Sequence, residues 1–154
     1  MTLALFQNRR VVTGFDEEGR GTVLYDGPVP QFGHEANTAV IWRTDSQPAD
    51  NAGNDDAATP FHLDLLKTPG STFAIFTIPP RTPLCLHATA TVDYIAILSG
   101  QATLVLEAEE VSLGAGDLIV DRGVTHGWRN DADEPCIAVG ISLPAHPLYS
   151  ETLL

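Results

Sequence analysis

The sequence predicts an all-β fold, an antiparallel sandwich or barrel. Helical periodicity is almost absent, and short strand-like runs are separated by Gly, Pro, Asp and Asn. Residues 85–101 alternate with a period of two, which is the period of a strand. Many short strands at this spacing are typical of sandwiches and barrels. Because 154 residues suffice for one domain with a sizeable core, we expect residues 1–154 to form a single domain.

Nine stretches of the chain have the composition of strands, and turn residues bound each of them. In chain order they are 22–27, 38–44, 71–80, 92–100, 101–107, 111–117, 118–123, 125–130 and 136–143. The sequences "SGQ" (99–101) and "EAEE" (107–110) predict hairpin turns between consecutive strands.

Two segments lie largely outside this series of strands. Residues 1–30 are expected to form N-terminal strands or an arm that covers or exchanges a barrel edge, because open edges need cover. Residues 45–60, "DSQPADNAGNDDAATP", are polar, acidic and poor in β-branched residues, which predicts a flexible loop rather than a domain linker.

Composition and charge exclude several classes of partner. The formal net charge is −12, and the basic residues are one lysine and seven arginines with no basic stripe, so we expect no nucleic acid or anionic lipid partner. No apolar run is long enough to cross a membrane. In "MTLALFQNRR" the charges follow the apolar patch, the reverse of a signal peptide, so we expect a cytoplasmic protein.

The alternating stretch 85–101 carries an unusual polar face. In one continuous strand, His87, Thr89, Thr91 and Asp93 would lie on the same side, together with Cys85. An imidazole and a carboxylate inside a barrel must pair with one another, with a metal or with a ligand. Two small buried thiols are the simplest interpretation of Cys85 and Cys136, with a metal or nucleophile role for Cys85 as the alternative.

A second polar cluster follows in "GAGDLIVDRGVTHGWRN" (114–130). His126, Trp128 and Asn130 share a parity there, and Asn130 is expected to bond to the backbone at a strand end. His87, Asp93 and His126 together make a possible set of two histidines and one carboxylate. These donors suit Fe, Mn, Zn or Ni, and without thiolates a structural zinc site is not expected.

At these residues the chain resembles a small single-domain cupin. The first cupin motif runs glycine, five residues, His-x-His, three or four residues, glutamate, six residues and glycine. His87, Thr89, Asp93 and Gly100 take its two histidine positions, the glutamate and the final glycine. The second motif runs glycine, five residues, Pro-x-Gly, two residues, His, three residues and Asn. Gly116, Gly123, His126 and Asn130 take its two glycines, the histidine and the asparagine, and Arg122 replaces the proline. A subgroup with His-x-Thr-x-Thr-x-Asp-Tyr is the most similar.

The resemblance implies a double-stranded β-helix, or jelly-roll barrel, that is usually dimeric and has its core motifs within 84–143. It also implies a metal or ligand site inside the barrel, for which Cys85, Thr89, Thr91 and Trp128 are the candidate pocket residues beside His87, Asp93 and His126. The sequence departs from the metal-binding pattern, because Thr89 replaces a histidine and Asp93 replaces the longer glutamate.

Three functions remain open from the sequence. The first is an enzyme with one divalent metal that performs lyase, dehydratase or dioxygenase chemistry on a small, partly apolar metabolite. The second is a metal-poor barrel that binds a small ligand or a partner without catalysis. The third is a metal-free isomerase or dehydratase in which His87, Asp93 and His126 act directly as acids and bases.

Overall fold

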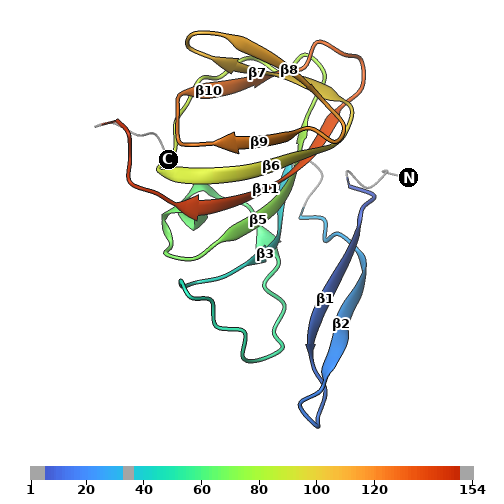
Figure 1. The fold of residues 1–154 in the computed structure, drawn as a ribbon. Coiled ribbons are helices and arrows are strands. Elements are labelled where there is room, and N and C mark those ends of the chain that lie inside the picture. Colours follow the sequence, from blue (N-terminus) through green and yellow to red (C-terminus); the bar gives the residue numbers. More distant parts are fainter. Residues whose placement is uncertain (1–5, 33–36, 150–154) are drawn as a thin grey trace.

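The computed structural model describes residues 6–32 and 37–149, and almost all of its regular structure is β (Figure 1). The strands form three antiparallel sheets. One has six strands in the order β4-β3-β5-β11-β6-β9, one has three in the order β10-β7-β8, and β1 and β2 form a separate pair. None of the helical structure in these residues has the length and apolarity to cross a bilayer. The prediction of an all-β chain is confirmed.

The bounds of the elements agree closely with the predicted strands. They are β1 (Arg9–Phe15), β2 (Gly21–Pro28), β3 (Thr38–Arg43), β4 (Thr59–Pro60), a 3-10 helix η1 (Leu63–Lys67), β5 (Thr72–Ile78), β6 (Thr91–Ser99), β7 (Gln101–Leu106), β8 (Glu110–Gly114), β9 (Leu118–Asp121), β10 (His126–Arg129) and β11 (Cys136–Pro144). Three elements were not predicted individually from the sequence: β1, β4 and η1.

The six-stranded and three-stranded sheets enclose the main core. Its buried side chains come from the inner faces of four strands in the two sheets: Ile78, Ile95, Ile97, Ala102, Cys136 and Ala138. Cys136 is fully buried and behaves as a small apolar residue, as expected. Burial raises the pKa of its thiol, which keeps it protonated and unreactive.

One of the two predicted hairpin turns is wrong. "EAEE" does connect a hairpin, because β7 pairs with β8. At "SGQ", however, β6 and β7 belong to different sheets, and Gly100 forms a corner between them. Gly100 has φ +75°, and a Cβ at this position would lie 2.5 Å from the carbonyl oxygen of Pro135. The prediction of a turn at Gly100 was therefore right. The contact with Pro135, which makes this turn a corner between two sheets, cannot be predicted from neighbouring residues.

The predicted strand through 85–101 is also interrupted. Regular pairing begins only at Thr91, where β6 runs between β11 and β9. His87 instead forms an isolated bridge with His126, in which each backbone N–H donates to the other's carbonyl oxygen at 2.9 Å. The chain thus leaves the three-stranded sheet at His87 and joins the six-stranded sheet at Thr91. Side chains between these two residues therefore do not alternate regularly between two faces of one strand.

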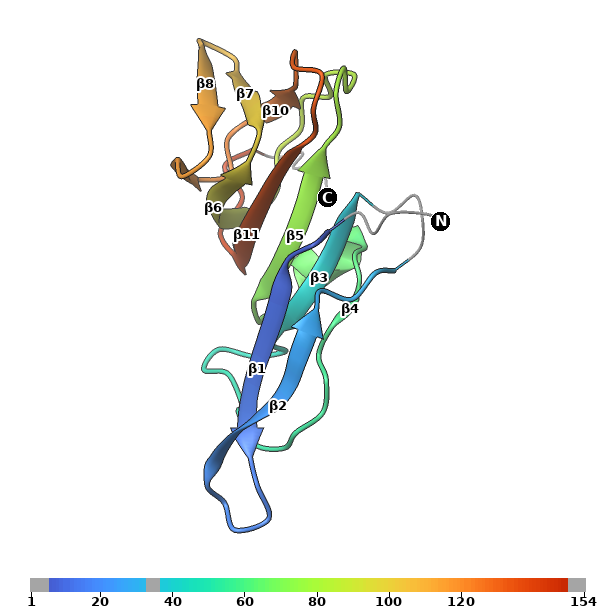
Figure 2. The same ribbon diagram turned by 90° about the vertical axis from the view of Figure 1, so that its right-hand side faces the viewer.

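The N-terminal hairpin β1–β2 is a separate sheet, and its tip extends past the lower ends of β3 and β5 (Figure 2). The acidic segment predicted as a loop has no regular structure until β4 and is fastened to this hairpin. The side chain of Asn54 accepts from the Phe15 N–H and donates to the Phe15 carbonyl oxygen, and Arg10 makes a two-pronged ion pair with Asp56 at 2.7–2.8 Å. Residues 1–5 of the predicted arm lie outside the described residues.

Candidate functional site

A cavity of about 240 Å³ lies between the inner face of the six-stranded sheet and β10, with η1 on one side. Its apolar wall consists of Phe61, Leu63, Leu66, Ala74, Phe76, Ile95 and Trp128. Its polar residues are Thr38, His87, Thr89, Asp93, His126 and Ser142. Cavities with mostly apolar walls and a few polar groups are typical of small-molecule sites.

The two histidines of the cavity are placed as a pair. Their ring centroids are 4.6 Å apart, and the backbone bridge between their strands fixes this spacing. The Nδ1 atom of His87 lies 3.1 Å from the carbonyl oxygen of Cys85, and that of His126 lies 3.0 Å from the carbonyl oxygen of Val124. Because a carbonyl oxygen only accepts, these contacts place the proton of each neutral ring on Nδ1. Within the described residues, neither Nε2 has a hydrogen-bond partner, so both lone pairs are available to a guest.

Asp121 contacts the His126 ring at Nδ1, the nitrogen on the side away from Nε2. Its Oδ2 lies 2.8 Å from His126 Nδ1, and the two side chains are only 5% and 6% exposed. The Nδ1–H points to the carbonyl oxygen of Val124, so Oδ2 acts on the ring mainly through its charge. Asp121 Oδ1 accepts the backbone N–H groups of Gly123 and Val124 at 2.9 and 3.3 Å, which holds the carboxylate in the turn before β10.

Burial and pairing act in opposite directions on this couple. Burial raises the pKa of Asp121, but contact with His126 and the two backbone donors outweighs it and holds the pKa below its usual value. Burial likewise lowers the pKa of His126, but Asp121 and the Val124 carbonyl outweigh it and raise that pKa. Both shifts favour the charged pair, an ionised Asp121 carboxylate beside a protonated His126 ring.

Asp121 was not among the site residues predicted from the sequence. The proline of the second cupin motif stands two residues before its glycine, and counting back from Gly123 reaches Asp121 rather than Arg122. Assigning the substitution to Arg122 was therefore wrong, and Arg122 is exposed. One feature of the sequence could have identified Asp121: it is a carboxylate five residues before His126, at a position where the motif has no titratable group.

Asp93 supplies the third polar group of the cavity. Its Oδ1 is buried and has no hydrogen-bond partner in the described part of the chain. Burial raises the pKa of this carboxyl above its usual value, although interactions with Ser142 and Thr91 oppose the rise. An unpaired buried carboxylate oxygen costs free energy, so this atom is a natural place for a proton, a ligand or an ion.

Five of the seven predicted site residues meet in this one cavity, namely His87, Asp93, His126, Thr89 and Trp128. The other two do not line it. Cys85 is exposed, because the chain is not yet in β6 at that point and its carbonyl, not its thiol, contacts His87. Thr91 is 1% exposed and its hydroxyl is 2.7 Å from that of Thr89, so it lies behind the wall as a support.

The cavity has the right kinds of donor for a divalent metal. Two imidazoles with free Nε2 atoms and an unpaired carboxylate oxygen are ligands that Fe, Mn, Zn and Ni accept, and metal-binding histidines characteristically bond their second nitrogen to a carbonyl or carboxylate. As arranged here, however, the described residues contain no group of three or more His, Cys, Asp or Glu side chains placed to hold one ion. The metal and its ligand set therefore stay a prediction.

Comparison with known proteins matches the part of the chain that builds this cavity. Residues 74–142 match the family described as "Cupin domain". "Phomopsin biosynthesis cluster protein C'" of Diaporthe leptostromiformis is 28% identical over 129 residues, which cover 75% of this chain and 67% of that protein. "Cupin-domain-containing oxidoreductase srdB" of Neurospora crassa is 26% identical over 147 residues, which cover 92% and 71%.

Among solved structures, an uncharacterised protein with a double-stranded β-helix domain from Klebsiella pneumoniae aligns with a TM-score of 0.46 and 26% identity, over 51% of this chain and 70% of that one.

Proposed function

Residues 74–142 of this chain form a cupin domain, and from that premise we propose that the protein is an enzyme acting on a small, partly apolar organic molecule inside the barrel. The observation that carries the proposal is the paired placement of His87 and His126. Their Nε2 atoms are free on the wall of a cavity that also holds the unpaired Oδ1 of Asp93. Polar groups left unpaired in an apolar cavity are costly unless a guest uses them.

The walls define the class of substrate. Three aromatic rings, Phe61, Phe76 and Trp128, contribute to a cavity of about 240 Å³, which suits a compact aromatic or branched molecule. None of the described lining residues is Lys or Arg, and Asp93 is acidic. A neutral molecule with a carbonyl or hydroxyl group directed at the histidines therefore fits better than a phosphate or a polyanion.

The residues support proton transfer on such a molecule. In its neutral form, with the Nδ1 proton directed at Val124 and Asp121, His126 can use Nε2 to accept a proton from carbon beside a carbonyl, and its raised pKa makes it a stronger base. Burial raises the pKa of Asp93, so its protonated form can give a proton to the carbonyl oxygen, or to a leaving hydroxyl that departs as water. The first exchange produces an isomerised enol or ketone and the second a dehydrated product, so isomerase or dehydratase chemistry needs no further co-reactant.

Metal-dependent oxidoreductase chemistry is the second candidate. Two observations favour it: the free Nε2 atoms, and the name of the Neurospora crassa relative, which is described as an oxidoreductase. His87 and His126 would hold Fe, Mn, Zn or Ni, with Asp93 as third ligand. Such an ion supplies Lewis-acid or dioxygen chemistry when bound. Non-catalytic binding is the remaining alternative, and the threonine in the second histidine position, Thr89, is the feature that favours it.

Hydrogen–deuterium exchange at the methyl group of acetophenone, a neutral aromatic ketone, tests the proposal. Protein purified without chelator is first analysed for metal, and exchange in D₂O is then followed by NMR before and after dialysis against EDTA. We expect exchange above buffer that survives EDTA and falls about 10²–10⁴-fold in His126→Ala. His146→Ala, at an exposed histidine, is the matched control and should keep the wild-type rate.

The other outcomes identify the alternatives. Stoichiometric metal that disappears in both His87→Ala and His126→Ala, with exchange lost on EDTA treatment, supports the metal-dependent enzyme. Exchange that is unchanged in His126→Ala contradicts the role given to that residue. Absence of both metal and exchange, with acetophenone still quenching the fluorescence of Trp128 in a Trp42→Phe variant, indicates a binder and overturns the proposal of an enzyme.

A further inference from the structure

The inner face of the six-stranded sheet forms one wall of the cavity, and the strand register divides this wall into rows. The row of Ser142 and Asp93 is polar. It lies beside His126, because Asp121, the next residue of this row, contacts that ring. Two residues further along each strand the row is apolar and runs across β3, β5, β11 and β6: Val40, Ala74, Gly140 and Ile95. The wall therefore changes from polar to apolar between two adjacent rows.

The wall on β10 changes in the same direction. His126 lies at the polar end, and Trp128, two residues further along the strand, lies at the apolar end with its ring centroid 6.4 Å from that of Phe76. Phe76 follows Ala74 by two residues on β5, and both aromatic rings pack against the buried core, so they close this end of the cavity. A guest whose polar group reaches His126 therefore has its apolar part over the row of Ala74 and Gly140.

Gly140 leaves space open in the middle of the apolar row. Its neighbours of the same parity on β11 face inward, since Ala138 is fully buried in the core and Ser142 lines the cavity. A side chain at residue 140 would point the same way. A Cβ there would lie 3.4 Å from Ile95 and 3.6 Å from Phe76, which are both residues of the cavity wall. The glycine therefore leaves room in the cavity that any other residue would fill.

The backbone does not require glycine at this position. β11 pairs regularly with both β5 and β6 at Gly140, and the φ angle of Gly140 is not in the left-handed region. The distances from its Cβ position are ordinary van der Waals contacts, unlike the 2.5 Å approach to a carbonyl oxygen at Gly100. A glycine inside a strand is less stable than an alanine. The space that Gly140 leaves in the cavity is therefore what explains this residue.

We propose that Gly140 determines the specificity of the site, and that it favours a ketone with a planar aromatic ring over one with a branched alkyl group. The inference rests on the proposed function, because it takes this cavity as the substrate site. At residue 140 the wall is bare backbone, one strand wide, between Ala74 and Ile95. A planar ring contacts such a strip over its whole face, whereas a tetrahedral carbon contacts it at a few atoms. The polar row is about 6.8 Å away along the strand, so a carbonyl attached to the ring points toward Asp93.

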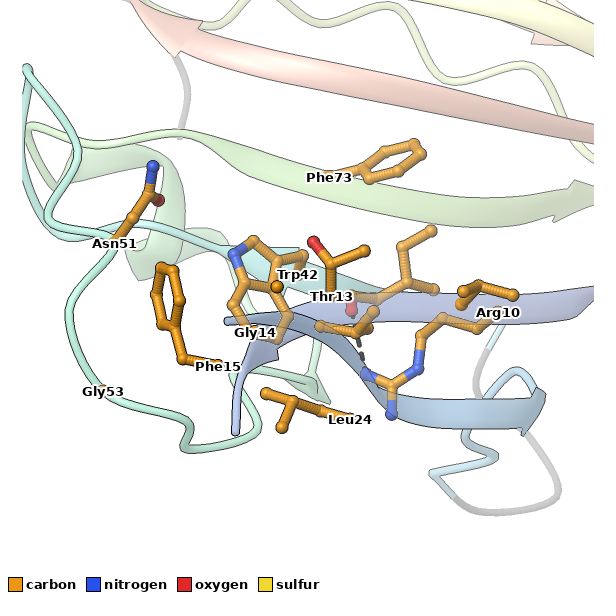
Figure 3. Close-up of a pocket in the computed structure, with 13 residues that line it drawn as sticks. Arg10, Thr13, Gly14, Phe15, Leu24, Trp42, Asn51, Gly53 and Phe73 are labelled. Atoms are coloured by element: carbon orange, nitrogen blue, oxygen red, sulfur yellow. Dashed lines mark hydrogen bonds between the residues drawn. The ribbon is translucent and has the colours of Figure 1, made fainter. Parts of the chain in front are cut away.

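A second hollow, on the other face of the sheet, has to be separated from this site in a binding measurement. It has a volume of about 530 Å³ and lies between the hairpin β1–β2 and strands β3 and β5, and Figure 3 shows Trp42 and Phe73 on its walls. Phe73 precedes Ala74 on β5 and therefore faces away from the cavity. Since the chain has two tryptophans, Trp42→Phe leaves only Trp128, whose fluorescence reports on the cavity.

Quenching of Trp128 fluorescence in the Trp42→Phe protein measures the affinity for acetophenone, and competition measures that for pinacolone, a methyl ketone with a tert-butyl group in place of the ring. We expect acetophenone to bind about 10-fold or more tightly than pinacolone. Adding Gly140→Ala should weaken acetophenone binding about 10–200-fold, because a methyl group then occupies the place of the ring. The same variant should unfold at an equal or higher urea concentration. Gly114→Ala, in β8 where a Cβ would meet nothing within 4 Å, is the matched control and should keep the affinity.

Moving the open space by one strand separates a role in the cavity from a role in the backbone. In the double variant Ala74→Gly with Gly140→Ala, the methyl group passes from β5 to the paired residue of β11, and the row keeps its total volume. We expect this variant to bind acetophenone about 10-fold more tightly than Gly140→Ala alone. A glycine needed only by the backbone of β11 would give no such recovery.

The outcomes for Gly140 and for the proposed enzyme can be told apart. Selective binding of acetophenone that Gly140→Ala weakens, without deuterium exchange in the methyl group, supports the role of Gly140 and contradicts the enzyme. Acetophenone that does not bind, a preference for pinacolone, or an affinity unchanged in Gly140→Ala would each overturn the inference, even if exchange is observed. A urea midpoint lowered by Gly140→Ala would also overturn it, because the fold would then require the glycine.

Discussion

Replacing Asp121 with asparagine is expected to move the proton of the neutral His126 ring from Nδ1 to Nε2. The Oδ1 of the new amide would keep the backbone donors of Gly123 and Val124, which hold that oxygen now. Its NH₂ group would then face Nδ1 at the position of Oδ2, 2.8 Å away. An amide donor 2.8 Å from Nδ1 favours the tautomer in which Nδ1 accepts, against the Val124 carbonyl at 3.0 Å that now accepts the Nδ1 proton, and we expect the amide to prevail and the proton to lie on Nε2.

The consequence for function is large whichever chemistry operates. With its proton on Nε2, His126 can neither accept a proton from a substrate nor coordinate a metal through that atom. We expect ketone exchange to fall about 10²–10⁴-fold, or metal affinity to fall about 10–100-fold if the site holds an ion. Because aspartate and asparagine have nearly the same shape, the Asp121→Asn variant should keep the fold. The tautomer of His126 can be measured directly by ¹⁵N NMR of its imidazole.

Asp93→Asn is the matched control, since it changes the other carboxylate of the cavity to an amide. Asp93 has no contact with His126 Nδ1, which is occupied by Val124 and Asp121, so the tautomer of His126 should not change in that variant. If Asp121→Asn leaves the proton on Nδ1, the carbonyl of Val124 alone fixes the ring, and Asp121 is not the residue that positions it.

Most strands of the fold could be predicted from the sequence, because the residues that favour a strand are neighbours in the chain. β-branched and apolar residues bounded by turn residues predicted nine strands. The cupin motifs predicted that these strands form a double-stranded β-helix, and this fold class is confirmed. The failures concern pairing partners. Whether Gly100 closes a hairpin or turns a corner depends on Pro135, 35 residues away, and no local pattern contains that contact.

The same distinction explains the result for the site. His87, Asp93 and His126 were found together because motif spacing reports on positions that a fold brings into one cavity. The placement of Cys85 and Thr91 in the cavity was wrong, because their predicted positions require one uninterrupted strand, whereas the chain passes from one sheet to the other between His87 and Thr91. The pairing of Asp121 with His126 depends on how the turn at Gly123 folds back, which the composition of that turn does not specify.

Asn130→Ala is expected to lower the free energy of unfolding by about 3–5 kcal/mol, a large effect for one side chain. Asn130 is fully buried where β10 ends, and its expected bonding to the backbone is confirmed. Its Nδ2 donates to the carbonyl oxygens of Ile78 and Glu134, both at 2.9 Å, and its Oδ1 accepts the N–H of Ala132 at 3.0 Å. Truncation leaves the buried carbonyl oxygen of Ile78 without its donor and removes the two part-buried bonds to Glu134 and Ala132, and urea unfolding measures the loss.

Asn130→Asp separates the lost hydrogen bonds from the lost volume. The carboxyl group fills the same space and still accepts from Ala132, but it directs an oxygen instead of an NH₂ group at the two carbonyls. Since two acceptors repel and a buried charge is costly, the aspartate variant should be at least as unstable as Asn130→Ala near neutral pH. Asp133→Ala, in the same loop but exposed, should leave the urea midpoint unchanged. An aspartate variant as stable as the wild type would show that volume alone matters, and that the amide does not join β5 to the loop before β11.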